Sequence, residues 1–279
     1  MNKELFYVET INCDNVILPG YYSGKKNNKC ILYIPGLGAS YESSLIPKEI
    51  FKYCGDFDFL CGLNQGNGII TELLINDDIN SIKNSGASYE DYNNWYSDID
   101  AWISYLNNYE NIIIIAHSLG CNKIIDYLNR KADNKISKII LLSPQDASYL
   151  VNLNKHCGML EEALENKENK NNNLLSNLFL GFCYLSTNTF LDFYYNKDIN
   201  NIPYLSTKDY TKIKNIKCSI DIIIGSKDKH DIDFKLIFTE LCNECSNVSY
   251  NIIEGANHNY NGKENVLAKL IFNIIDNDV

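Results

Sequence analysis

The sequence has no excess of positive charge. Its 279 residues include 25 Lys and Arg against 35 Asp and Glu, which gives a formal net charge of −10. Proteins that bind nucleic acid neutralise its phosphates with lysine and arginine, so we expect no nucleic-acid partner. The same negative charge disfavours binding to anionic membrane surfaces.

Long hydrophobic runs are also missing. No stretch approaches the roughly 20 apolar residues of a transmembrane helix, so we expect no insertion into a membrane. Residues 1–15 carry charges and asparagines where a secretory signal would be apolar. The ten cysteines are scattered, several of them within apolar runs typical of buried thiols. These features favour a reduced, cytoplasmic protein.

The cysteines show no complete metal-site pattern. Cys242 and Cys245 have the spacing of zinc or redox sites, but no second such pair or nearby histidine completes a zinc site. We therefore predict two ordinary thiols there, no metal and no organic cofactor. The oligomeric state has no recognisable signature in the sequence.

Short isoleucine-rich runs alternate with helix patterns along most of the chain. Each run is bounded by Gly, Pro, Asn or Ser, as expected for strands buried on both faces of a parallel sheet. We predict such strands at 30–34, 57–61, 112–116, 139–143, 220–224 and 248–253. Helices are predicted at 44–53, 91–106, 119–130, 232–242 and 264–275. This alternation predicts an α/β fold with a doubly wound, mostly parallel sheet, preceded by antiparallel edge strands within residues 5–22.

The alternation stops between residues 144 and 217, which predicts an insertion. We assign residues 1–145 and 211–279 to the core and 146–210 to a helical cap. An asparagine-rich tract lies in the cap, followed by a stretch with many aromatic residues. Phe182 and Phe190 are the predicted substrate contacts in that stretch. The alternative, that these aromatics only pack the cap on the sheet, stays open because cores and ligand pockets are both apolar.

Ser118 is the strongest candidate for a catalytic residue. The run 112–116 is followed by His117, Ser118, Leu119 and Gly120, and then by a helix pattern. A strand, a small-x-Ser-x-Gly turn and a helix place a serine hydroxyl above the sheet edge, with small flanking residues that avoid a collision. The helix N-terminus after it favours a developing negative charge.

A serine hydroxyl needs a base, and the base needs an orienting carboxylate. Asp228 follows the run 220–224 and its turn, and His258 follows the run 248–253. We predict that His258 is the base and Asp228 the acid.

Other residues compete for the two roles. His117 is expected to pack locally, His156 lies in the predicted cap, and His230 is the more serious alternative base. Asp231 and Asp233 share the loop of Asp228, but we expect them to begin the next helix, where carboxylates suit the helix dipole.

An oxyanion hole is predicted from two backbone N–H groups. One belongs to Leu119, directly after the serine, and the other to Leu37, in a glycine-containing loop after the first buried strand. Gly36 and Gly38 flank Leu37 and allow the backbone to approach a substrate closely.

These motifs together resemble the α/β-hydrolase superfamily over nearly the whole chain. Residues 36–40, 116–120, 225–228 and His258 carry the resemblance, and Ser, Asp and His follow in the order of that superfamily. Residues 141–146 and 189–193 further resemble a little-characterised hydrolase family of fungi and bacteria. The chain departs from the superfamily pattern at Pro35, where histidine often stands, and at Ala116, where glycine is usual.

The sequence favours a serine hydrolase that acts on a carboxylic ester or thioester. Two alternatives stay open: acyl transfer or peptide hydrolysis on the same triad, and a ligand-binding protein without turnover. The complete set of Ser118, His258, Asp228 and the oxyanion loop argues against a pure binding protein, although the fold alone would not.

Overall fold

The computed structural model describes residues 4–24, 27–146, 158–195, 208–228 and 234–277. An eight-stranded sheet runs through it in the order β1-β2-β4-β3-β7-β8-β9-β10. β1 and β2 pair antiparallel at one edge, and the strands from β4 to β10 are parallel. The strands of this sheet are β1 (Phe6–Ile11), β2 (Ile17–Tyr22), β3 (Lys29–Ile34), β4 (Asp58–Gly62), β7 (Asn111–His117), β8 (Ile136–Leu142), β9 (Ser219–Gly225) and β10 (Val248–Ile253). The predicted fold class is therefore confirmed.

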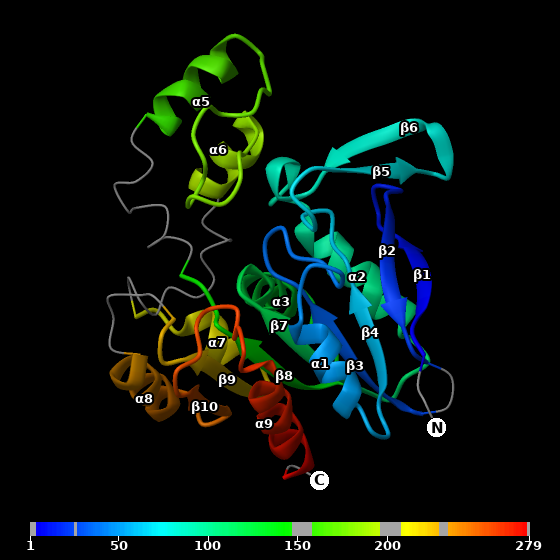
Figure 1. Cartoon of the computed structure of the whole chain (residues 1–279), viewed down its shortest axis with the longest axis vertical. Helices are drawn as coiled ribbons and strands as arrows, with labels where there is room; N and C mark the ends of the chain where they lie inside the picture. Colours follow the sequence, from blue (N-terminus) through cyan, green and yellow to red (C-terminus); the bar gives the residue numbers. More distant parts are fainter. Residues whose placement is uncertain (1–3, 25–26, 147–157, 196–207, 229–233, 278–279) are drawn as a thin grey trace.

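Helices cover both faces of this sheet (Figure 1). α1 (Ile46–Tyr53) and α9 (Glu264–Asp276) pack on one face, whereas α2 (Trp95–Tyr105), α3 (Leu119–Arg130), α7 (Thr211–Asn215) and α8 (Phe234–Glu244) pack on the other. The isoleucines of β7 alternate between the two apolar clusters, because successive side chains of a strand point to opposite faces. The central strands are therefore apolar along their length.

The chain order makes β3 the point where the strand order reverses. β3 pairs with β4 on one side and with β7 on the other. In open α/β sheets, ligands bind beyond the carboxyl ends of the strands at such a switch point. The loops after β3 and β7 meet there.

Two predicted boundaries differ from the structure by three residues or more, each for a local reason. α2 begins at Trp95 rather than residue 91, because the side chain of Asp91 accepts the backbone N–H of Asn93 and holds a turn. β8 begins at Ile136 rather than residue 139, and its polar Lys138 is accommodated by a buried ion pair with Asp221 of β9.

A hairpin that the sequence reasoning missed lies outside the main sheet. β5 (Thr71–Ile75) and β6 (Asp78–Ser85) pair antiparallel, and a short 3-10 helix, η1 (Ala87–Tyr89), follows them. Asn76 and Asp77 form the turn with φ of 54° and 56°. Two consecutive positive φ values are typical of the tightest hairpin turns, and Asn-Asp between two runs that mix apolar and polar residues was the available signature.

The described part of the insertion contains two helices, α5 (Met159–Glu168) and α6 (Thr187–Tyr195). They stand beyond the carboxyl edge of the sheet, beside the β5–β6 hairpin (Figure 1). Phe179 and Phe193 pack edge to face, and Phe193 also meets Tyr92, which lies just before α2. This aromatic cluster joins the insertion to the core.

Two further expectations concern the whole chain. Among the described residues, no helix is long and apolar enough to cross a membrane. The nine cysteines in this part of the chain are free thiols, including Cys242 and Cys245.

Candidate active site

Ser118 occupies a sharp turn between β7 and α3. Its backbone has φ 53° and ψ −124°, a conformation that residues with a side chain rarely adopt. A Cβ on Gly120 would lie 2.7 Å from the carbonyl oxygens of both Ile34 and Pro35, so a side chain has no room there. The small residue in the serine motif is thus explained by the close approach of the loop after β3.

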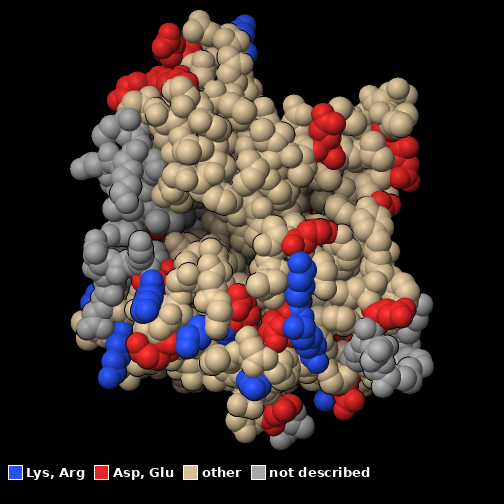
Figure 2. Space-filling model, in the orientation of Figure 1, with Lys and Arg blue, Asp and Glu red and all other residues tan. Residues whose placement is uncertain are grey.

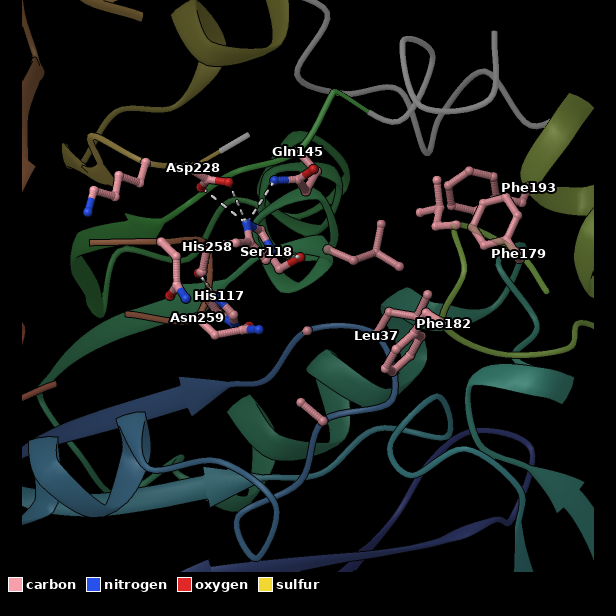
Figure 3. A pocket seen from close by; sticks show the side chains of 16 residues that line it. Leu37, His117, Ser118, Gln145, Phe179, Phe182, Phe193, Asp228, His258 and Asn259 are labelled. Carbon is pink, nitrogen blue, oxygen red and sulfur yellow. Dashed lines mark hydrogen bonds and ion pairs between the residues drawn. The ribbon is translucent and has the colours of Figure 1, made fainter. Parts of the chain in front are cut away.

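The side chains of Ser118, His258 and Asp228 form a continuous hydrogen-bonded chain (Figure 3). Ser118 Oγ lies 3.0 Å from His258 Nε2. His258 Nδ1 lies 3.1 Å from both carboxylate oxygens of Asp228. The Asp228 side chain is 2% exposed and that of His258 32% exposed. A buried carboxylate thus holds the imidazole with Nε2 toward the serine, the arrangement that a general base requires.

Close contact between two loops sets the position of Asp228. The Asp228 N–H donates to the carbonyl of Gly225 over 3.0 Å, and the Lys227 N–H donates to Ala256 over 2.8 Å. A Cβ on Gly225 would lie 2.3 Å from the Ala256 carbonyl oxygen, so glycine permits this approach. The loops after β9 and β10 are joined here, which brings the acid to the base.

Several other residues were candidates for the base or the acid. His156, His230, Asp231 and Asp233 lie outside the described residues. His117 is buried, and its Nε2 donates to the backbone carbonyl of His258 over 2.9 Å. It therefore supports the loop of His258 through a contact that is distant in sequence rather than local, and does not approach the serine as a base.

Burial, with a smaller contribution from the neighbouring His258, lowers the pKa of His117 from 6.5 to about 3. In the unfolded chain the His117 imidazole binds a proton near pH 6.5, whereas in the folded protein it becomes protonated only near pH 3. The unfolded state binds more protons between these values, so this group lowers stability as the pH falls. Each pH unit well below 6.5 removes about 1.4 kcal/mol.

A His117→Gln variant tests this pH dependence. Glutamine keeps an N–H donor for the His258 carbonyl and removes the titration. Between pH 7 and pH 5, we expect the wild-type free energy of unfolding in urea to fall by about 2 kcal/mol more than that of the variant. Equal falls in the two proteins would contradict a neutral, buried His117.

The two predicted oxyanion donors line the same cavity as Ser118. The N–H groups of Leu37 and Leu119 donate no backbone hydrogen bond to any described residue and are available to a ligand. A Cβ on Gly36 would lie 2.8 Å from Ser118 Cβ, so the glycine lets the loop reach the serine.

Asn67 holds the oxyanion loop, residues 36–40, by a side-chain hydrogen bond. Its Nδ2 donates to the Ala39 carbonyl, and its Oδ1 accepts the N–H of Asn64. Beside it, the carbonyl of Gly66 accepts the Gly38 N–H over 3.1 Å. The loop after β4 thus fixes the loop after β3, and the sequence reasoning missed this support.

A cavity of about 430 Å³ opens at the triad. Figure 2 shows the hollow beneath the insertion bordered largely by uncharged residues. One part of its lining is apolar and consists of Leu37, Leu119, Phe179, Leu180, Phe182 and Phe193. The other part is polar and consists of His117, Gln145, Lys227, Asp228, Asn257, His258 and Asn259.

The two predicted substrate contacts separate in the structure. Phe182 lines the cavity, is 51% exposed and lies against Gly38 of the oxyanion loop. Phe190 is only 1% exposed and packs within the aromatic core of the insertion, 6.3 Å from Phe179 between ring centres. It does not line the cavity because its face of α6 is covered. For Phe190, the packing alternative describes the structure better.

Comparisons with known proteins found one family model and several solved structures of similar fold. A serine hydrolase family model matches residues 76–177, which include Ser118 but end before Asp228 and His258. The fold is similar to an esterase of Pyrococcus furiosus, with 16% identity, 97% of this chain and 91% of that chain covered, and a TM-score of 0.60. The chain has the fold of the α/β hydrolases. The finer resemblance to a family of fungi and bacteria stays a prediction.

Two other solved structures share this fold. One is Est1E of Butyrivibrio proteoclasticus with bound ferulic acid, at 15% identity, TM-score 0.63, and 95% and 97% coverage of this chain and that chain. The other is DcsB in complex with its substrate analogue, at 10% identity, TM-score 0.71, and 99% and 100% coverage. No curated protein sequence matches the chain.

Gln145 is a further polar residue of this site that the sequence reasoning did not select. Its Nε2 donates to the Ser143 carbonyl over 3.2 Å and lies 3.3 Å from His258 Nδ1. Gln145 follows β8 by a few residues. Because the carboxyl ends of parallel strands meet at one edge, its position after that strand was the available signature.

Proposed function

We propose that this α/β hydrolase cleaves a carboxylic ester or thioester through an acyl-enzyme on Ser118. The observation that carries the proposal is the hydrogen-bonded chain from Ser118 through His258 to Asp228 at the wall of a cavity. A strained serine, a base and a buried acid in one chain are the parts of an activated nucleophile.

The proposed reaction has two steps. Ser118 Oγ attacks the acyl carbon while its proton moves to His258 Nε2, and the N–H groups of Leu37 and Leu119 stabilise the resulting oxyanion. When the tetrahedral intermediate collapses, the carbon–oxygen or carbon–sulfur bond breaks and His258 returns the proton to the leaving group. Water then attacks the acyl-enzyme with His258 again as the base, which releases the acid and restores Ser118.

Hydrolysis is favoured over the two alternatives on different grounds. The esterases with a similar fold support ester cleavage, whereas their low identity leaves acyl transfer and peptide hydrolysis as alternatives on the same residues. A ligand-binding protein without turnover would gain nothing from a serine held in a strained backbone conformation beside a base.

A fluorophosphonate probe and a panel of nitrophenyl esters test the proposal together. We expect the probe to label the protein once, at Ser118, and the panel to be hydrolysed with a preference for a limited range of acyl lengths. Competing alcohols, amines and peptides distinguish transfer and peptidase activity by their products. Absence of both labelling and ester turnover would refute the proposed hydrolase.

The placement of Phe182 and Phe190 predicts opposite outcomes for matched substitutions. Phe182→Ala enlarges the cavity, so we expect kcat/KM to shift toward longer acyl groups, by about 1 to 3 kcal/mol per methylene at most. Phe190→Ala leaves a void in the aromatic core and is expected to lower the free energy of unfolding by about 3 to 5 kcal/mol.

Chain-length profiles and urea unfolding of both variants check this pair of outcomes. An unchanged profile in Phe182→Ala would remove Phe182 from the acyl site, and a shifted profile in Phe190→Ala would restore the original prediction for that residue.

We further propose that residues 146–210 act as a cap over a core formed by 1–145 and 211–279. The packing of Phe193 on Tyr92 supports a fixed attachment of this cap to the core. We propose a cytoplasmic location, which the free cysteines of the described residues support because reduced thiols persist in that compartment.

A further inference from the structure

The two sides of the cavity differ in chemistry, and Ser118 lies between them. In Figure 3, Leu37, Phe179, Phe182 and Phe193 lie to one side of Ser118, with His258, Asp228 and Asn259 to the other. Both groups line the same cavity. A substrate attacked by the serine therefore has one half in apolar surroundings and the other in polar surroundings.

The reaction decides which half of an ester lies on which side. His258 must return a proton to the leaving alcohol, so the alcohol oxygen lies near His258 Nε2. The acyl substituent points away from the base, toward the aromatic residues of the insertion. The polar side of the cavity thus receives the alcohol and the apolar side receives the acyl group.

The polar side is rich in hydrogen-bond donors. Lys227 is the single lysine or arginine among the described residues that line the cavity. None of the ion pairs between described residues involves it. The Oδ1 of Asn257 accepts the Asn261 N–H over 3.0 Å, which leaves its NH₂ group as a donor. Asn259 lies exposed beside His258.

Asp228 is the single carboxylate among the described residues that line the cavity, and it is hydrogen-bonded to His258. Asp228 is buried and both of its carboxylate oxygens face His258 Nδ1, but it keeps its negative charge, so an anion bound on this side depends on the positive charge of Lys227. Lys227 directly precedes Asp228, and Asn257 directly precedes His258, while the backbone hydrogen bond from Lys227 to Ala256 joins the two loops. Lys227, Asn257 and Asn259 all belong to the lining of the cavity that would hold the leaving alcohol.

We propose that the substrate is an ester of an apolar, aryl-sized acid with an alcohol that carries a carboxylate or a phosphate. Lys227, Asn257 and Asn259 bind the anionic alcohol, and Leu37, Phe179 and Phe182 bind the acyl group. This inference rests on the proposed hydrolase, because it uses His258 to orient the ester.

The net charge of the protein allows an experiment to separate a local effect of Lys227 from the overall electrostatic field. At −10, the overall field attracts cations and repels anions. A preference for an anionic alcohol must therefore come from local groups such as Lys227. An overall electrostatic effect would give the opposite order.

The experiment compares phenylpropanoate esters of alcohols of similar length. The alcohols are 3-hydroxypropanoate, 2-hydroxyethyl phosphate, butan-1-ol and 3-(trimethylammonio)propan-1-ol, and product release is followed at low ionic strength. We expect kcat/KM for the better anionic ester to exceed that of the cationic ester about tenfold, and this ratio to decline in 0.5 M NaCl. The ranking of the first two esters distinguishes a carboxylate from a phosphate.

Lys227→Met is the decisive variant, and Lys269→Met, an exposed lysine of α9 outside the cavity lining, is its matched control. We expect the anionic-to-cationic ratio to fall to about one or below in Lys227→Met and to persist in the control. An unchanged ratio in Lys227→Met, or a wild-type preference for the cationic ester, would overturn the proposal.

A further arm tests which side binds the acyl group. Butyl hemisuccinate carries its charge on the acyl half, and we expect it to be a poorer substrate than butyl phenylpropanoate. A preference for the hemisuccinate would reverse the assignment of the two sides. These outcomes refute the inference while ester hydrolysis stands, whereas failure of all esters together with unlabelled Ser118 refutes the proposed function.

Discussion

Ser118→Ala is expected to abolish fluorophosphonate labelling and to reduce ester hydrolysis by about 10⁶-fold in kcat, by the precedent of serine hydrolases whose triad acts as one unit. The physical reason is that Ser118 Oγ, 3.0 Å away, is the one nucleophile among the described residues that contacts His258 Nε2. His258→Ala should cause a loss of similar size, because the serine hydroxyl is a poor nucleophile without its base.

The double variant gives the internal control for this prediction. Removing both Ser118 and His258 should be no worse than removing one, since the two residues contribute a single step. Rates are measured with the nitrophenyl ester that the wild-type protein prefers, after urea unfolding has confirmed that each variant is folded. Equal labelling of Ser118→Ala, or a larger loss in His230→Ala than in His258→Ala, would show that the nucleophile or the base is another residue.

Asp228→Asn is expected to lower kcat by up to about 10⁴-fold while the protein stays folded. Asparagine keeps the size of the side chain, but it can donate a hydrogen bond to His258 Nδ1 and so stabilise the wrong tautomer of the imidazole. In that tautomer Nε2 carries the proton and no longer accepts one from Ser118. The carboxylate oxygens of Asp228, both 3.1 Å from Nδ1, exclude this arrangement in the wild-type protein.

Asp231→Asn and Asp233→Asn provide the comparison, because these two carboxylates follow Asp228 within five positions of the chain. We expect each to change stability by a few tenths of a kcal/mol and activity little, as for acidic residues near a helix N-terminus. Turnover of the three purified variants decides among the carboxylates. Near wild-type turnover in Asp228→Asn, with a collapse in one of the others, would place the orienting acid elsewhere.

The local patterns of the sequence sufficed for the sheet and for the order of the site residues. Buried strands such as β7 are continuous runs of isoleucine, and a strand followed by Ser118 and Gly120 indicates a sharp turn into a helix. Because parallel strands end at one edge, residues that follow different strands are expected together even when more than a hundred positions separate them. This argument brought Asp228 and His258 to Ser118.

Other features were decided by contacts that no local pattern contains. Phe182 and Phe190 are alike in the sequence, yet one faces the cavity and the other is enclosed by the aromatic core of the insertion. Asn67 supports the oxyanion loop across a distance of 28 residues. The sequence by itself determined the type of each element and the candidate reactive groups, because these depend on neighbouring residues. Only the tertiary structure decided which side chains border the cavity and how its two sides differ in polarity, because those properties depend on which distant surfaces meet.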